Sequence, residues 1–144
     1  DSSTVAQIEA VLAERRLTGL VGVRNQLDLT PMADAAGFTE AAAAVLADPG
    51  VDLAVVGCVP LTPALATLAP DRGHAEDLAA PGGVAGRLAD LWKASRKPWV
   101  LVVDGGALYD PLARHLERVG VPVFRTADRA VRALSRYAGW RLGR

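Results

Sequence analysis

The sequence of 144 residues has few of the features that mark several large classes of protein. With a single cysteine, Cys58, the chain forms no internal disulfide, which is typical of a reducing compartment. Its 16 basic and 16 acidic side chains balance, so no charge excess points to nucleic acid or to an acidic membrane surface. No apolar run is long enough to cross a membrane, and no signal peptide is recognisable. We therefore expect a cytoplasmic protein that binds neither nucleic acid nor membrane.

Short motifs of the common cofactor sites are missing as well. The sequence contains no G-x-G-x-x-G, no Walker A loop and no Cys/His pair at the spacing of metal ligands. We therefore predict no metal site and no cofactor bound by this domain alone.

The chain is long enough for one domain with a substantial core, because 51% of its residues are apolar. Its most apolar stretch covers residues 53–59 and is followed by Pro60 and Pro63, which cannot continue a strand. A run that is apolar on both faces is typical of a central parallel strand covered by helices on each side. This predicts that residues 53–58 form the central strand, and that aspartate in place of Val55 would unfold the domain.

Other strands and helices are predicted to alternate along the chain. Apolar runs predict strands at residues 99–103, beside the central strand, and at 121–124. Helical spacing and capping residues predict helices over residues 4–16, 38–47 and 84–94, between Asp110 and Gly120, and after Thr126, before a basic tail at 141–144. Such alternation requires parallel pairing through right-handed crossovers. We therefore expect one α/β domain over residues 1–144, a three-layer flavodoxin-like fold with a mainly parallel sheet.

Two stretches have weaker patterns. Residues 17–23 fit either a strand or a loop, because glycines interrupt a short apolar run. Residues 70–83 mix Pro, Gly and charged residues, which predicts a mobile loop or an insertion.

Parallel strands bring the loops at their carboxyl ends to one edge of the sheet, where α/β proteins bind ligands. In the loops after the first two strands, Thr62, Gly105 and Gly106 are the candidates for binding phosphate or another anion. They offer one hydroxyl and two bare backbones next to expected helix starts. Two glycines are equally what a tight turn needs, and the carboxylate of Asp104 would repel an anion.

Cys58, His74 and His115 are the residues with other possible chemistry. No histidine lies close to Cys58 in the sequence, so a buried structural thiol is favoured over a nucleophile. His74 lies in a Pro/Gly-rich stretch with acidic neighbours, which favours a solvated side chain, and we expect no phosphate on it. His115 lies on a charged helix face and is given no role. The sequence thus predicts no catalytic residue.

Three separated segments resemble the NDP-forming acyl-CoA synthetases and their succinyl-CoA synthetase relatives. Residues 25–30, Asn-Gln-Leu-Asp-Leu-Thr, are similar to the family's Asn-Pro-x-Asp-Leu segment. Residues 46–52, Leu-Ala-Asp-Pro-Gly-Val-Asp, look like its helix-to-strand turn. Residues 120–126, Gly-Val-Pro-Val-Phe-Arg-Thr, look like its Gly-Ile/Val-Pro-Val-Phe/Tyr-Arg-Thr ending. Together the segments resemble the second flavodoxin-like domain, equivalent to the carboxyl end of the succinyl-CoA synthetase β subunit.

The family-motif residues carried over to this chain are Asn25, Asp28 and Pro60, and the chain departs from the family beside them. Gln26 stands where the family usually has Pro. Pro60 and its neighbours replace the Gly-Gly loop of the succinyl-CoA enzymes, where the following helix start faces the phosphohistidine. His74, within Gly-His-Ala, is superficially similar to the family's phosphohistidine loop. That loop belongs to a preceding domain, so we interpret His74 as a decoy.

The resemblance implies a role in a larger enzyme. The full reaction of that family joins an acid and CoA at the expense of ATP or GTP, with Mg²⁺, through an acyl phosphate and a phosphohistidine. This domain would help to shape the phosphotransfer site, with the CoA-binding and ATP-grasp domains of the same enzyme as partners in a homo- or hetero-oligomer. Because the chain does not begin with Met and has room for none of those domains, we expect a fragment of a longer ligase, inactive by itself. The alternative is a non-catalytic flavodoxin-like module that makes interactions or subunit contacts.

Overall fold

The computed structural model places residues 1–143 in an α/β fold, and the description below applies to those residues. They form five α-helices, two short 3-10 helices and a three-stranded parallel sheet. The predicted basic tail at 141–144 therefore falls partly outside the described residues. Among residues 1–143, no helix combines the length and apolar character needed to span a bilayer.

The sheet consists of β1 (Ala54–Cys58), β2 (Trp99–Val103) and β3 (Val123–Phe124), in the order β1-β2-β3. All pairing is parallel, and the register of the longer pair runs from Ala54 opposite Trp99 to Cys58 opposite Val103.

The prediction that residues 53–58 form the central strand is wrong. The central strand is β2, whose five residues are all buried, whereas β1 lies at the edge of the sheet with Val55 41% exposed. An apolar run by itself does not distinguish an edge strand from a central strand. The exposure of Val55 depends on which helices cover its face of the sheet.

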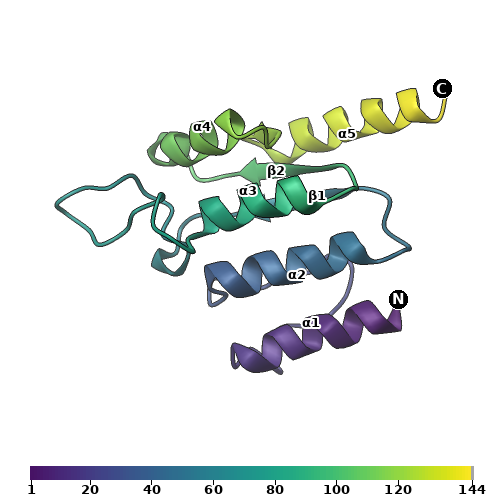
Figure 1. Ribbon diagram of the computed structural model, residues 1–144, viewed down its shortest axis with the longest axis horizontal. Coiled ribbons are helices and arrows are strands. Elements are labelled where there is room, and N and C mark those ends of the chain that lie inside the picture. The colour runs from purple at the N-terminus through teal and green to yellow at the C-terminus, as the bar shows by residue number, and fades with distance from the viewer. Residues whose placement is uncertain (144) are drawn as a thin grey trace.

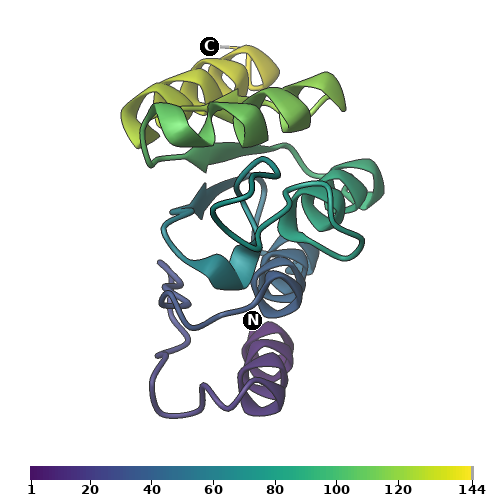
Figure 2. The same ribbon diagram turned by 90° about the vertical axis from the view of Figure 1, so that its left-hand side faces the viewer.

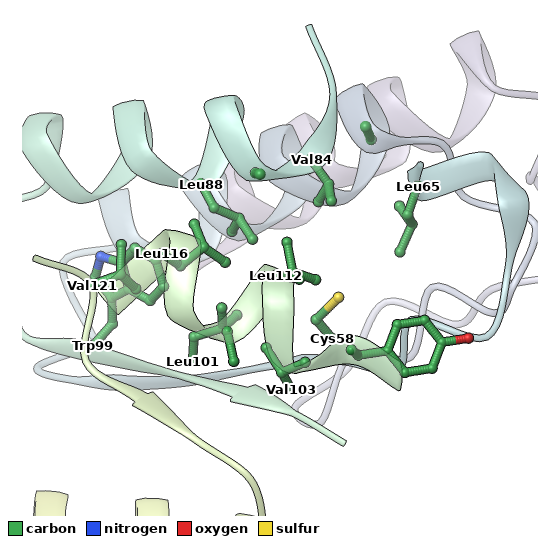
Figure 3. Packing of buried hydrophobic residues seen from close by; sticks show 14 of the residues in the cluster. Cys58, Leu65, Val84, Leu88, Trp99, Leu101, Val103, Leu112, Leu116 and Val121 are labelled. Carbon is green, nitrogen blue, oxygen red and sulfur yellow. The ribbon is translucent and has the colours of Figure 1, made fainter. Parts of the chain in front are cut away.

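Helices cover both faces of the sheet and make three layers. On one face α5 (Ala127–Arg141) packs against β2, through a cluster that buries Val100, Val102, Ala130 and Leu134. On the other face α3 (Val84–Ala94) and α4 (Asp110–Arg118) pack over Trp99, Leu101 and Val103. Figure 3 shows this second cluster, with Leu88 and Leu112 above the strands. The predicted flavodoxin-like, three-layer class is confirmed.

The first two helices stack outward from α3. α2 (Ala35–Ala47) contacts α3, and α1 (Ser2–Glu14) packs on α2 through Ile8 and Leu12 (Figure 1). Figure 2 shows α1 and α2 at one end of the molecule and α5 at the other. The caps are aspartates: Asp1 accepts a hydrogen bond from the N–H of Thr4, and Asp34 from that of Gly37. The first helix therefore begins two residues before the predicted start at residue 4.

Residues 15–34 and 66–83 connect these elements without regular helix or strand. Residues 17–23 form only an isolated bridge between Thr18 and Val21, so they add no strand to the sheet. Residues 70–83 are anchored to the core, because Leu78 is buried and its N–H donates to the carbonyl of Leu68 at 2.8 Å.

Candidate functional site

The loops after β1 and β2 lie side by side at the carboxyl edge of the sheet, as parallel pairing requires. The N–H of Asp104 donates to the carbonyl of Cys58 at 3.3 Å. Pro60 is fully buried, and its Cγ would lie 3.0 Å from a Cβ placed on Gly105. The structure therefore brings the family-motif residue Pro60 next to the predicted anion-binding glycines.

The two glycines are required by the turn that they form. A Cβ at Gly105 would lie 2.7 Å from Cδ2 of Tyr109, which is closer than side-chain atoms approach. Gly106 has φ of +79°, a conformation that other residues adopt only with strain. Among the described residues, no protein acceptor pairs with the N–H of either glycine. The turn explains both glycines and also leaves two backbone donors available.

Thr62 is engaged in holding another segment. Its hydroxyl donates to the carbonyl of Pro31 at 3.1 Å and accepts from the N–H of Ala64 at 3.3 Å. The first bond ties the loop after β1 to the end of the segment that contains Asn25 and Asp28. The motif segment at 25–30 is thus brought to the carboxyl edge of the sheet.

Asn25 and Asp28 themselves are exposed in this segment. The Oδ1 of Asp28 accepts the N–H of Thr30 at 2.9 Å, which makes a local turn. Neither side chain makes a hydrogen bond to the glycine turn at 105–106, so within residues 1–143 these two motif residues shape their own loop.

Arg125 is the functional candidate that the sequence analysis missed. It follows β3 directly, and its Nη2 donates to the carbonyl of Gly106 at 2.5 Å. Its Nη1 is buried and lies 2.9 Å from Oδ1 of Asp110, without the alignment of a hydrogen bond. The guanidinium, 34% exposed, therefore places a positive charge beside the glycine turn. Loops that follow parallel strands lie at one edge of the sheet. Applied to the loop after β3 as well, this rule would have identified Arg125.

Helix dipoles contribute less to this edge than expected. β1 is followed by the 3-10 helix η1 (Pro63–Leu65), and the next α-helix, α3, begins only at Val84. β2 is followed by the 3-10 helix η2 (Ala107–Tyr109), and α4 begins after it at Asp110. η1, with three residues, aligns too few peptide dipoles to attract an anion strongly, so only η2 with the contiguous α4 contributes a helix dipole at this edge. The backbone donors and Arg125 are then the main attractive groups.

Carboxylates lie close to the same groups. Asp110 is shared by Arg125 at 2.9 Å and Arg114 at 3.9 Å, so the charge of Arg125 is partly neutralised. Asp104 is exposed beside the turn and forms no ion pair among the described residues. The edge therefore offers backbone hydrogen-bond donors beside charged groups of both signs.

The remaining candidate groups have little chemistry to offer. Cys58 is fully buried under α3 and α4 (Figure 3), and burial raises the pKa of its thiol to about 12. The thiol stays protonated, so the prediction of a structural cysteine is confirmed. His74 is exposed and His115 half-buried. Among residues 1–143, no three His, Cys, Asp or Glu side chains gather closely enough to hold a metal ion.

A groove of about 830 Å³ opens elsewhere, between residues 69–79 and the outer side of α4. Its walls include Pro70, Leu78, His115 and Arg118. Thr62, Gly105 and Gly106 do not line it, so the hollow and the predicted anion site are separate.

Comparison with known proteins leaves the family open. No family model matches the chain, and neither the curated proteins nor the solved structures include a significant match. The resemblance to acyl-CoA synthetases therefore stays a prediction that depends on the residues quoted above.

Proposed function

We propose that this chain is a domain of an NDP-forming acyl-CoA synthetase and helps to shape its phosphotransfer site. The observation that supports the proposal is that two of the three resembling segments, 25–30 and 120–126, come close to the carboxyl edge of the sheet, while the third, 46–52, leads into the amino end of β1. The 25–30 segment reaches this edge through the bond from Thr62 to Pro31, and the 120–126 segment reaches it through Arg125 on Gly106. Segments that resemble the family and are far apart in the sequence thus supply neighbouring groups.

In this proposal the chain binds and orients a phosphoryl group while other domains react with it. The N–H groups of Gly105 and Gly106 donate hydrogen bonds to phosphate oxygens, and Arg125 contributes a fixed positive charge. The thiol of Cys58 takes no part in the reaction, because it is buried and its pKa is raised to about 12. The phosphohistidine of the reaction is carried by a partner domain, and His74 plays no part.

CoA, ATP or GTP and Mg²⁺ belong to the partner domains in this account. Proteins usually hold Mg²⁺ through one or two carboxylates together with waters and substrate phosphates, and in this proposal the partner domains supply those carboxylates. The pairing of Asp110 with Arg125 gives the reason why the domain needs its partners: they add the cations that a phosphoryl group requires.

The second candidate is a non-catalytic module that uses the same fold for subunit contacts. The observation that favours it is the exposed edge of β1. Val55 is an apolar residue of this edge strand, and 41% of its surface is exposed to solvent.

The anion site is tested by titrating the chain with inorganic phosphate and following amide chemical shifts. We expect shifts at Gly105, Gly106 and Thr62, and a loss of affinity of about tenfold in Arg125→Gln, since a charge-assisted hydrogen bond is worth about 1.5 kcal/mol or more. Arg141→Gln, which removes a charge from the end of α5, is the matched control and should leave the affinity unchanged. Shifts confined to residues near Arg141 would show that the turn does not bind phosphate.

The assignment to the ligase is tested separately by reading the coding sequence on both sides of this chain. A continuous reading frame that encodes a phosphohistidine loop and an ATP-grasp domain would support it. A complete gene that encodes this domain alone would contradict it and favour the interaction module.

A further inference from the structure

The groove between residues 69–79 and α4 has two unlike walls and is separate from the glycine turn at 105–106. One wall is apolar, and its lining residues are Ala69, Pro70, Leu78 and Ala79. The other wall is α4, which lines the groove with Pro111, Arg114, His115, Glu117 and Arg118. Small-molecule sites are commonly hollows of about this size, 830 Å³, lined by apolar groups with a few polar ones.

The apolar wall is held in place by a carboxylate. Oε2 of Glu76 accepts hydrogen bonds from the N–H of Thr67 at 2.8 Å and from that of Leu68 at 3.4 Å. The N–H of Leu78, a buried residue, donates to the carbonyl of Leu68 at 2.8 Å. Because these bonds join the end of the loop to its beginning, the apolar wall has a defined position opposite α4.

The acidic groups of this loop are engaged by backbone N–H groups and do not line the groove. Oδ1 of Asp71 and Oδ1 of Asp77 each accept the N–H two residues further on, at 2.8 Å in both cases. Glu76, the third acidic residue of 69–79, is bonded as described above. Among residues 1–143, none of the three forms an ion pair with α4. The loop therefore leaves the charges of the facing wall uncompensated.

The α4 wall carries more positive than negative charge. Arg114 and Arg118 lie one helical turn apart and line the groove from the same side of the helix. Arg118 forms no ion pair among residues 1–143, and Arg114 lies 3.9 Å from Asp110, which also pairs with Arg125 at 2.9 Å. Against these two guanidiniums, α4 places one carboxylate on the groove, that of Glu117. The groove thus combines an apolar wall with a wall that attracts an anion.

We propose that this groove binds a phosphate monoester with an apolar group. The guanidiniums of Arg114 and Arg118 and a ring N–H of His115 donate hydrogen bonds to the phosphate, and the apolar part of the ester packs against Pro70 and Leu78. Arginine suits this role because its planar set of N–H groups matches the oxygens of a phosphate.

The number of donors is the reason to assign a phosphate and not a carboxylate. Two guanidiniums and an imidazole on one helix face offer three donor groups, and a phosphate monoester presents three terminal oxygens, whereas a carboxylate presents two. This site does not depend on the proposed role in phosphotransfer, because its residues and those of the glycine turn are different.

Titration with phenyl phosphate, followed by amide chemical shifts, tests the site. We expect saturable shifts in residues 69–79 and 111–118. Phenol, benzoate and inorganic phosphate each lack part of the ligand and should bind the groove about tenfold more weakly or worse. No saturable shift up to about 10 mM phenyl phosphate, or equally tight binding of any of the three, would overturn the proposal. Shifts confined to Gly105 and Gly106 would also overturn it, while supporting the separate anion site at the turn.

The head-group contacts are tested by substitution. Arg118→Gln should lower the affinity for phenyl phosphate about tenfold, since it removes a charged donor from the groove. Arg129→Gln removes an exposed arginine from α5, on the other face of the sheet, and should leave the affinity unchanged. Thermal melts confirm that both variants are folded. Unchanged affinity in Arg118→Gln, or an equal loss in both variants, would contradict the assigned contacts.

The role of Glu76 as a positioning residue is tested by Glu76→Ala. Loss of its bonds to Thr67 and Leu68 should speed amide exchange in residues 69–79 and weaken the binding of phenyl phosphate, because the apolar wall is no longer fixed. Asp71→Ala removes a carboxylate that bonds only within its own turn, and should change neither measurement appreciably. Faster exchange with an unchanged affinity would show that the fixed wall does not contribute to binding.

Discussion

At the scale of single residues, Gly105 combines a packing requirement with the availability of a backbone donor. Its hydrogen leaves space for Tyr109 and Pro60, and a Cβ would meet them at 2.7 and 3.0 Å. The same lack of a side chain keeps the N–H of Gly105 open at the edge of the sheet. A glycine in a strand-end turn can thus be explained by packing without losing its value for binding.

The packing requirement predicts that Gly105→Ala destabilises the chain by about 1–3 kcal/mol, because the added methyl forces Tyr109 or Pro60 to move. Gly106→Ala should cost about 1 kcal/mol, since φ is +79° there. Gly86→Ala is the matched control: this glycine lies within α3 with nothing close to its Cβ, so alanine should stabilise the helix by up to about 1 kcal/mol. Urea unfolding measures all three. A Gly105 variant as stable as the parent would refute the packing account.

Burial of Cys58 predicts an unreactive thiol. Its pKa is raised to about 12, so almost no thiolate exists at neutral pH, and the surrounding core excludes reagents. We expect a disulfide-exchange reagent to modify the folded chain only as fast as the chain unfolds, and to modify it at once in denaturant. Rapid stoichiometric modification under native conditions would show that the sulfur is accessible and reopen the question of a reactive cysteine.

At the scale of elements, β1 and β2 show what can be predicted from sequence and what cannot. Both are five-residue apolar strands, and both were located correctly from their apolar runs and flanking turns. Their order in the sheet was not predicted correctly, because the sequence of β1 is as apolar as that of β2. Order within a sheet depends on which strands meet and which faces the helices cover, and those contacts are distant in the sequence.

The candidate site shows a related limit. The carboxyl-edge rule located Gly105, Gly106 and Thr62 from sequence alone. It did not reveal that Thr62 is bonded to Pro31 across 31 residues, or that Arg125 reaches Gly106 across 19. Side-chain hydrogen bonds of this range follow from tertiary packing, which local patterns do not encode.

The difference between the two strands predicts opposite outcomes for the same substitution. Val102→Asp should unfold the domain, because an unpaired carboxylate in the centre of the sheet costs several kcal/mol against a total stability of roughly 5–15 kcal/mol. Val55→Asp should leave the chain folded, since its side chain reaches solvent at the edge. This replaces the expectation that Val55→Asp unfolds the domain. Circular dichroism melts decide the matter, and unfolding of the Val55 variant would mean that β1 is covered in solution.

At the scale of the whole molecule, Asp48 joins the outer helices to the sheet. In the isolated chain of residues 1–144, its carboxylate pairs with the ammonium of Asp1 at the start of α1, and it also accepts the N–H of Gly50 at 2.7 Å. Its backbone carbonyl accepts a hydrogen bond from Nζ of Lys97, just before β2. One residue at the end of α2 therefore contacts the start of α1 and the approach to the central strand.

These contacts predict a pH dependence of stability. In the isolated chain of residues 1–144, the bond from the ammonium of Asp1, followed by other hydrogen bonds, holds the pKa of the Asp48 carboxyl well below its ordinary value. A lowered pKa in the folded state stabilises the chain above the unfolded value of about 4, and the contribution is lost as the pH falls below it. Asp48→Asn should therefore melt at a lower temperature than the parent at pH 7, and the difference should shrink progressively in acid. Asp52→Asn, at the exposed turn before β1, is the control that should show no such trend. A constant difference at every pH would contradict the assignment.

Of the three apolar clusters within residues 1–143, two meet on α2. One gathers α1 and the irregular segment after it, with Ile8, Leu12 and Leu17 at its centre. The other lies on the face of the sheet that α3 and α4 cover, and α2 contributes Ala35 and Leu46 to it. Because the first cluster draws almost entirely on the first third of the chain, that layer can open while the sheet stays closed. Backbone amides of α1 should then exchange with heavy water through small, local openings, well before those of β2, whose exchange requires the whole domain to unfold.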